Sequence, residues 1–199
     1  MRILVVGTAG NVGKAAVAEL KPRHEIITAG RSSGDVRVDL LDAASISAMY
    51  EKLGKLDAVV ACAGHAHYGP LASMTETQFM VGLKDKLMGQ VNLVLLGTPY
   101  VNDRGSFTLT SGVVDRDPVL KACNAATVNA ALKGFVTGAA IELERGIRIN
   151  VVSPGLLQES VKKYEGLFPG HEAVSSARVG LAYAKSVEGA LTGQVIIIE

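Results

Sequence analysis

The sequence is poor in cysteine and has no long apolar run. Cys62 and Cys123 are the only cysteines among 199 residues, and they have neither metal-ligand nor Cys-x-x-Cys spacing. We therefore expect reduced thiols and no metal site. No apolar run reaches the about 20 residues that cross a bilayer, and the N-terminal run meets Gly7 too early for a secretory signal. These absences predict a soluble, cytoplasmic protein.

An excess of either charge is also missing. Lysine and arginine number 20 and aspartate and glutamate 19, which gives a net charge of +1 with the two signs intermixed. Such a chain offers no charged surface for nucleic acid or for a membrane. What is present is 48% hydrophobic residues in a length that fits one domain, residues 1–199. We expect a small-molecule substrate, or none, as the partner.

Short apolar runs alternate with longer segments of helical periodicity. Most runs are continuously apolar, as in strands that are buried on both faces of a parallel sheet. The alternation predicts βαβ units and hence a three-layer α/β/α fold. The predicted strands are Ile3–Val6, Glu25–Thr28, Val36–Val38, Ala58–Cys62, Ser106–Leu109, Ile147–Val152 and Gln194–Ile198, and the predicted helices are Asn11–Lys21, Ala43–Leu53, Glu76–Leu96, Lys121–Glu144 and Glu172–Val187.

Local signals mark two helix starts and one unusual connection. Thr75, with Gln78 three residues later, predicts a capping box at the start of the longest central helix. Asp42 is placed to cap the N-terminus of the predicted helix Ala43–Leu53. Only residues 30–35 join the second and third predicted strands, whereas a crossover helix needs about a dozen residues. We therefore expect the third strand to be a short edge strand.

A glycine-rich turn follows the first predicted strand and opens the first predicted helix. Glycines at such a turn let the backbone approach a pyrophosphate, whose charge the helix N-terminus stabilises. The G-x-x-G-x-x-G spacing is not that of the usual fingerprints, and a tight turn without a ligand is the alternative. The strand–turn–helix context favours a dinucleotide site. The predicted contacts are Gly7, Thr8, Ala9, Gly10, Asn11, Val12 and Gly13.

The end of the second predicted strand indicates the type of dinucleotide. A site for NAD places an acid there, which binds the ribose 2′-hydroxyl, but this chain has Gly30, Arg31, Ser32 and Ser33. A guanidinium and a hydroxyl suit a 2′-phosphate instead. The alternative is a solvated arginine in a turn. We predict NADP(H) as the cofactor, with Arg31 and Ser32 at its 2′-phosphate.

Other motifs resemble those of the short-chain dehydrogenase/reductase family. Arg148–Gly155 closely matches the Arg-Val-Asn-x-Val-x-Pro-Gly of that family, and Ala61–Gly64 is similar to its Asn-Asn-Ala-Gly turn. The resemblance covers essentially the whole chain. It implies a Rossmann-like, doubly wound parallel sheet of about seven strands in the order 3-2-1-4-5-6-7. It also implies cofactor contacts by Asp39, Leu40, Ala63, Gly64, Pro154 and Gly155.

The chain departs from the family at the catalytic positions. The family's Tyr-x-x-x-Lys falls on Ala125 and Asn129, its catalytic asparagine falls on Lys86, and only its serine is kept, as Ser111. The chain thus resembles a divergent subgroup that lacks the usual residues. The resemblance implies an oxidoreductase for a carbonyl or alcohol, with Ser111, Lys86 and Asn129 as candidate catalytic residues. The alternative is a catalytically silent NADP(H) sensor or interaction scaffold.

Periodicity places Lys86 on or beside a partly apolar stripe of its helix. A lysine buried there without a partner costs several kcal/mol, so we expect it to meet an acceptor, a ribose or phosphate, or a water-filled cleft. A lysine that reaches out from the edge of the stripe is the alternative. His67 or Tyr68 is a second candidate proton donor, or else a polar surface residue. Asp115–Pro118 predicts a turn without a functional role.

Small residues are frequent in the predicted helix Lys121–Glu144. They permit close packing against the sheet and against a partner. Relatives of this fold commonly pair through this helix and the one predicted at Glu76–Leu96. We therefore expect a homodimer or homotetramer that is built on these two helices.

Overall fold

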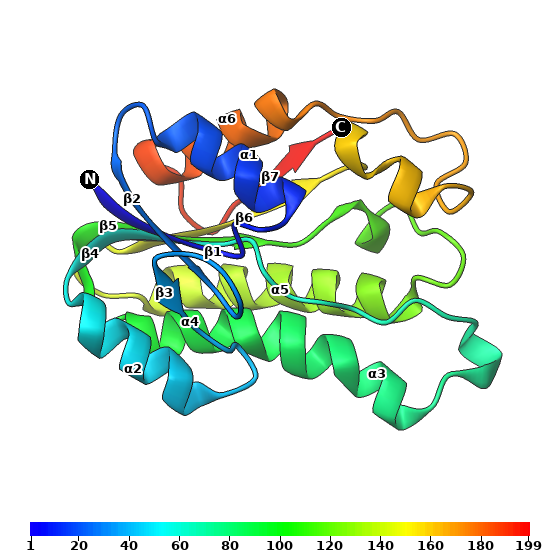
Figure 1. The fold of residues 1–199 in the computed structure, drawn as a ribbon, viewed down its shortest axis with the longest axis horizontal. Coiled ribbons are helices and arrows are strands. Elements are labelled where there is room, and N and C mark those ends of the chain that lie inside the picture. The colour runs from blue at the N-terminus through cyan, green and yellow to red at the C-terminus, as the bar shows by residue number, and fades with distance from the viewer.

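Seven parallel strands form the central sheet, in the order β3-β2-β1-β4-β5-β6-β7. The computed structural model describes residues 1–199, and its helices cover both faces of the sheet (Figure 1). This arrangement confirms the predicted doubly wound topology. The strands are β1 (Arg2–Val6), β2 (Glu25–Gly30), β3 (Val36–Arg37), β4 (Leu56–Ala61), β5 (Val101–Thr110), β6 (Arg148–Pro154) and β7 (Val195–Ile198), and the helices are α1 (Asn11–Leu20), α2 (Ala43–Leu53), α3 (Glu76–Gly82), α4 (Gly89–Gly97), α5 (Cys123–Glu142) and α6 (Ser176–Glu188).

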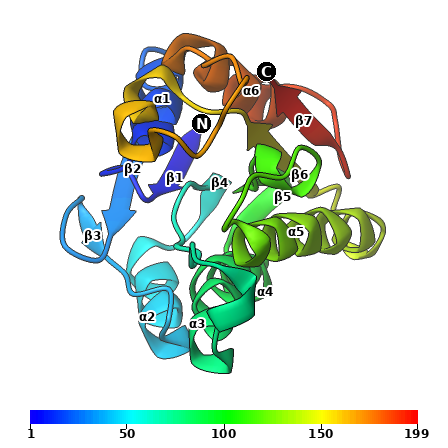
Figure 2. The same ribbon diagram turned by 90° about the vertical axis from the view of Figure 1, so that its right-hand side faces the viewer.

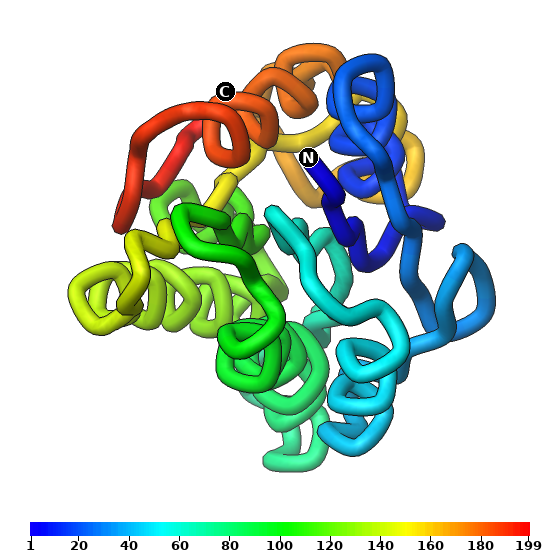
Figure 3. The backbone as a smooth tube through the Cα atoms, turned by 90° about the vertical axis from the view of Figure 1, so that its left-hand side faces the viewer, coloured from blue at the N-terminus to red at the C-terminus, as the bar shows by residue number.

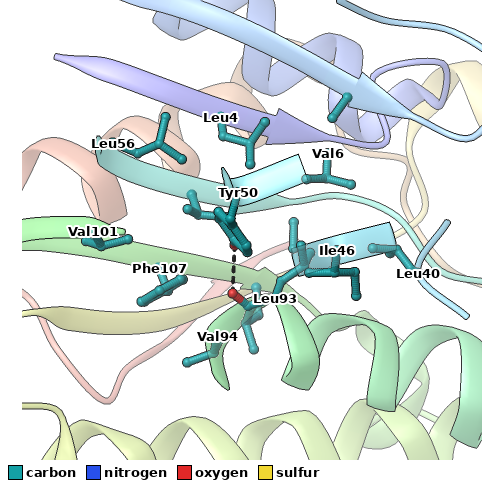
Figure 4. Packing of buried hydrophobic residues seen from close by; sticks show 14 of the residues in the cluster. Leu4, Val6, Leu40, Ile46, Tyr50, Leu56, Leu93, Val94, Val101 and Phe107 are labelled. Carbon is teal, nitrogen blue, oxygen red and sulfur yellow. Dashed lines mark hydrogen bonds between the residues drawn. The ribbon is translucent and has the colours of Figure 1, made fainter. Parts of the chain in front are cut away.

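The strands are buried on both faces because two hydrophobic clusters lie on opposite sides of the sheet. Leu4 and Val6 of β1 belong to the larger cluster, on the side of α2, α4 and α5 (Figure 4). Ile3 and Val5 belong to the cluster under α1 and α6. This alternation explains why the strands read as continuous apolar runs. In the larger cluster, the Tyr50 hydroxyl donates to the Leu93 carbonyl oxygen at 2.7 Å.

The predicted helix starts and the short edge strand are confirmed. Thr75 and Gln78 form both hydrogen bonds of a capping box, and the Asp42 side chain accepts from the backbone nitrogen of Ala44. β3 has only two residues and pairs with β2. The end-on view of Figure 3 shows the chain passing from β2 to β3 through a loop, without a helix.

Two helices differ from the sequence-based expectation. α6 begins at Ser176 rather than Glu172, because the Ser175 side chain caps it and Val174 forms a β-bridge with Leu157. The long helix expected over residues 76–96 is continuous, but a π-helical segment, Leu83–Met88, separates α3 from α4. None of the helices is both long and apolar enough to cross a membrane.

Candidate cofactor and active site

A cavity of about 590 Å³ lies at the carboxyl ends of β1, β2 and β4. That edge of a doubly wound sheet is where such folds bind ligands, and the size lies within the usual range for ligand sites, about 300–1,000 Å³. The predicted contacts on its wall are Gly7, Thr8, Ala9, Gly10, Arg31, Ser32, Asp39, Leu40, Ala63, Gly64 and Lys86. The cavity therefore joins four separate turns of the chain into one site.

Two of the three glycines in the glycine-rich turn are required by packing. Gly7 has φ +91°, and a Cβ there would lie 2.8 Å from the Ala63 side chain. A Cβ on Gly13 would lie 2.3 Å from the carbonyl oxygen of Gly7. Gly10 has more room, since its nearest neighbour is 3.7 Å away, and it lies on the cavity wall at the start of α1. The lack of a side chain at Gly13 thus lets the first turn of α1 pack closely against the backbone of Gly7.

The other predicted cofactor contacts do not lie on the cavity wall. The Asn11 side-chain amide donates to the Ser160 hydroxyl at 3.0 Å, and Val12 packs on the hydrophobic cluster under α1. Pro154 is buried at the end of β6, and the Gly155 backbone nitrogen donates to the Ile198 carbonyl oxygen at 2.7 Å.

The turn after β2 presents Arg31 and Ser32 to the cavity. Both residues are exposed, and Arg31 forms no ion pair with the protein. The nearby acid, Asp35, instead accepts hydrogen bonds from the Thr28 backbone nitrogen and hydroxyl, which hold the pKa of its carboxyl below the usual value. The guanidinium of Arg31 is therefore available to an anion.

At the other end of the cavity, the three candidate catalytic residues come together from three different elements. The Lys86 ammonium donates to Asn129 Oδ1 at 2.6 Å and to the Ser111 carbonyl oxygen at 3.2 Å. Asn129 Nδ2 donates to the Gly112 carbonyl oxygen at 3.2 Å, which fixes the orientation of its amide. The predicted meeting of Lys86 with an acceptor is confirmed.

The environment of Lys86 changes its acidity. Burial disfavours the charged ammonium and lowers the pKa of Lys86 to about 8, while the negative charge of Asp115 acts in the opposite direction. Close packing fixes the lysine stem, because a Cβ on Gly64 (φ +126°) would lie 2.7 Å from the Lys86 Cα. Lys86 lies in the π-helical segment, a feature that often occurs at functional sites.

Ser111 and Ala125 complete this end of the site. The Ser111 hydroxyl is buried without a hydrogen-bond partner, and such atoms in folded proteins usually have one. Ala125 lies on the cavity wall and packs with Val113, Val114 and Ala122. The position that aligns with the family's tyrosine thus holds a small apolar side chain on the cavity wall, whereas Ser111 is buried and does not line the cavity.

The two alternative proton donors, His67 and Tyr68, differ in their position relative to the cavity. His67 does not lie on the cavity wall, and its backbone nitrogen donates to Asn124 Oδ1 at 2.8 Å. Tyr68 does lie on the wall, but burial raises the pKa of its hydroxyl to about 12. The neighbouring His65 was not anticipated: it lies on the wall with its Nδ1 3.0 Å from Asp85 Oδ2.

The Asp115–Pro118 segment is more than a turn. The Asp115 carboxylate is 1% exposed and forms an ion pair with Lys133 of α5. Arg116 donates to the Ser153 hydroxyl at 2.6 Å, which ties this segment to β6. No local sequence pattern announces these contacts, because both partners lie far along the chain. The segment therefore has a structural role, and the expectation that it has no functional role stays a prediction.

Comparisons with known proteins agree with this architecture. A family model described as Enoyl-(Acyl carrier protein) reductase matches residues 3–187. The structure of the protein lin1944 from Listeria innocua is 47% identical, with a TM-score of 0.99 and full coverage of both chains. A small-chain dehydrogenase in complex with NADPH is 25% identical, with a TM-score of 0.86 over 100% of this chain and 96% of the other. A search among curated proteins gave no match.

A doubly wound sheet with a glycine-rich turn at a cavity over the strand ends defines a dinucleotide-binding α/β protein. The family match over residues 3–187 identifies one family within this class. The protein belongs to the short-chain dehydrogenase/reductase family. Its sheet order and single-domain architecture are those that the resemblance implied.

Proposed function

We propose that this protein is an NADP(H)-dependent oxidoreductase for a carbonyl or alcohol substrate, with Lys86 as the proton donor in place of tyrosine. The family and the NADPH complex of a 25% identical relative support the cofactor. The observation that carries the proposal is that Lys86, which lies on the cavity wall, donates to the Asn129 side chain and to the Ser111 carbonyl oxygen.

The cofactor is proposed to lie along the cavity wall, with its diphosphate at Gly7–Gly10. Arg31 and Ser32 hold the 2′-phosphate, since an unpaired guanidinium favours that group. Asp39 and Leu40 lie on the wall between the turns and are assigned to the adenine. Ala63 and Gly64 follow, toward Lys86. When bound, the cofactor supplies a hydride or accepts one.

Lys86 is suited to proton transfer because one of its N–H groups has no acceptor in the protein. An ammonium has three N–H groups, and Asn129 and the Ser111 carbonyl accept two of them. The third is free to donate to a substrate oxygen. A group with a pKa of about 8 holds its proton at neutral pH and releases it readily. Asn129 orients the amine, and the unpartnered Ser111 hydroxyl is assigned a hydrogen bond to the same substrate oxygen.

A second function is favoured by Ala125. With no tyrosine beside the cofactor, the protein would act as a silent NADP(H) sensor or scaffold if Lys86 only balanced charge in the site. In that case Lys86 would bind cofactor without supporting turnover. The same cavity serves either function, so catalysis has to be measured separately from binding.

We also propose a homodimer or homotetramer that forms through the long helix of residues 76–97 and α5. Val81, Met88 and Leu95 follow one another at seven-residue spacing on the first helix and are all exposed. On α5, Gly134 and Gly138 have open space where a Cβ would stand. A stable interface buries about 1,200–2,000 Å² in total, and light scattering at micromolar concentration tests it. We place the protein in the cytoplasm, where its two free cysteines stay reduced.

The test is a titration with NADPH and NADH, followed by a screen of carbonyl substrates on the same preparation. We expect tighter binding of NADPH than of NADH, because only NADPH gives Arg31 a phosphate. The Arg31→Asp variant should reverse that order by adding charge repulsion. Equal affinities in the unmodified protein would contradict the NADP(H) assignment. Binding without any turnover would favour the silent alternative.

A further inference from the structure

The segment of residues 156–175, between β6 and α6, covers part of the cavity. We call it the cover segment. Figure 2 shows its first helical turns beside α1. Ser160 accepts the hydrogen bond from Asn11, and three residues later Lys163 and Tyr164 lie on the cavity wall. A residue of the glycine-rich turn region thus holds the cover segment in place.

Lys163 is a cation without an anionic partner in the protein. It is exposed, forms none of the ion pairs of the structure, and its ammonium lies 5.1 Å from the centre of the Tyr164 ring. An exposed lysine pays side-chain entropy when it pairs with an anion, so a single contact of this kind contributes only modestly to binding. Its neighbour Lys162 is also exposed but does not lie on the wall.

We propose that Lys163 is a cofactor-binding residue and that it pairs with the diphosphate rather than with the 2′-phosphate. This inference rests on the proposed NADP(H) site. The tether to Asn11 places the start of the cover segment at the first turn of α1, where the backbone turn is built for a diphosphate. Arg31, in contrast, is on the β2–β3 turn. The two cations therefore serve different phosphates of one ligand.

The choice of nucleotide distinguishes a contact with the diphosphate from a contact with the 2′-phosphate. NADPH, NADH and ADP all carry a diphosphate, whereas only NADPH carries the 2′-phosphate. The Lys163→Met variant should weaken all three by about three- to tenfold, the range for one partly exposed charge-assisted hydrogen bond. Isothermal titration calorimetry measures the three dissociation constants. The Lys163→Arg variant should retain most of the affinity, because it keeps the charge.

Lys162→Met is the matched control, since it removes an identical charge one residue away. It should change none of the three affinities by more than about twofold, because it affects only the screened overall field. All variants should melt at the same temperature without nucleotide, since both lysines are exposed.

Three results from the variants, and one from the unmodified protein, would overturn the inference. A loss confined to NADPH would move Lys163 to the 2′-phosphate. Equal effects of Lys162→Met and Lys163→Met would reduce the contribution to general charge attraction. Unchanged affinities in Lys163→Met would remove the residue from the site, while the proposed function would stand. Failure of the unmodified protein to bind NADPH, NADH and ADP would overturn the proposed function together with this inference.

Discussion

Backbone groups form one end of the cavity, and side-chain hydrogen bonds form the other. At the glycine-rich end, consecutive residues Gly7–Gly10 form the wall, and their backbone conformation does the positioning. At the Lys86 end, the Lys86 side chain of the π-helical segment donates to the Asn129 side chain of α5 and to the backbone carbonyl oxygen of Ser111, which follows β5. The first end depends on a local turn, and the second depends on packing between helices and the sheet.

This difference explains which features of the family survive in this chain. A backbone turn persists as long as its glycines and its neighbouring strand and helix persist. A side-chain site can lose a group at one position and gain it at another, provided that the atoms reach the same place. The hydrogen bond from Lys86 to Asn129 fits this view, because the resemblance aligns Asn129 with the family's lysine and the amine now comes from the neighbouring helix.

The largest effect is expected from removing the amine. Lys86→Met should lower any turnover by about 10²–10⁴-fold, the usual contribution of a positioned acid. It should also weaken NADPH binding, because it removes a positive charge from the cavity wall. Steady-state kinetics and an NADPH titration measure the two effects. Lys84→Met is the control, since Lys84 is an exposed lysine of the same π-helical segment that does not line the cofactor cavity.

An unchanged rate and affinity in Lys86→Met would leave the silent binder as the better description. The comparison between the two ends would then hold for binding alone, with no chemistry at the Lys86 end.

Restoring the family motif should not repair conventional carbonyl reduction. In the Ala125→Tyr/Asn129→Lys variant, Lys86 loses its 2.6 Å acceptor and gains a second cation nearby. Two cations in one cleft depress each other's pKa, and the lost hydrogen bond costs about 1–3 kcal/mol. We expect turnover of simple ketones at or below that of the unmodified protein, in the same assay. Robust ketone turnover by either protein would show that the Lys86 arrangement is not the decisive change.

The sequence predicts the glycine-rich end well because its signals are local. The Gly7–Gly13 spacing, the preceding apolar strand and the following helix all lie within one short stretch. The same is true of the Thr75 capping box and the two-residue β3, which follow from neighbouring residues. Contiguous signals of this kind need no knowledge of tertiary packing.

The Lys86 end could be predicted only in outline. The resemblance aligned Lys86, Ser111 and Asn129, and the helical stripe indicated an acceptor for the lysine. Nothing in the sequence indicated the π-helical segment, because an extra residue in a helical turn has no fixed residue signature. The buried pair of Asp115 with Lys133 was missed for another reason: its partners lie in different elements, and no local pattern links an acid after β5 to a lysine of α5.

The backbone end can be tested with two glycines that differ in their surroundings. Gly13→Ala places a Cβ 2.3 Å from the Gly7 carbonyl oxygen, so the turn has to shift. Such overpacking costs about 1–3 kcal/mol, which lowers the melting temperature by about 2–12 °C in a domain of this size. Gly10→Ala has 3.7 Å of room and should melt within about 2 °C of the unmodified protein. Similar melting temperatures for the two variants would contradict a packing role specific to Gly13.

The next effect is expected from pH, at the Lys86 end. If the Lys86 ammonium gives the proton during reduction, the rate should be constant below the pKa of about 8 and fall about tenfold for each pH unit above it. In the oxidation direction the neutral amine takes up the proton, so the rate should rise with pH through the same value. Lys86→Met should remove the transition near pH 8 in both directions.

The free energy of unfolding should also depend on pH through Lys86, and it should rise with pH. Burial lowers the pKa of Lys86 from its ordinary 10.5 to about 8, so the unfolded chain binds more protons than the folded protein between these two values. Stability against unfolding therefore rises as pH increases from about 8 to 10.5, because the folded protein no longer buries a charge there. The slope of unfolding free energy against pH in urea titrations measures this contribution. It should be smaller in Lys86→Met, and an identical slope in both proteins would mean that another group titrates in this range.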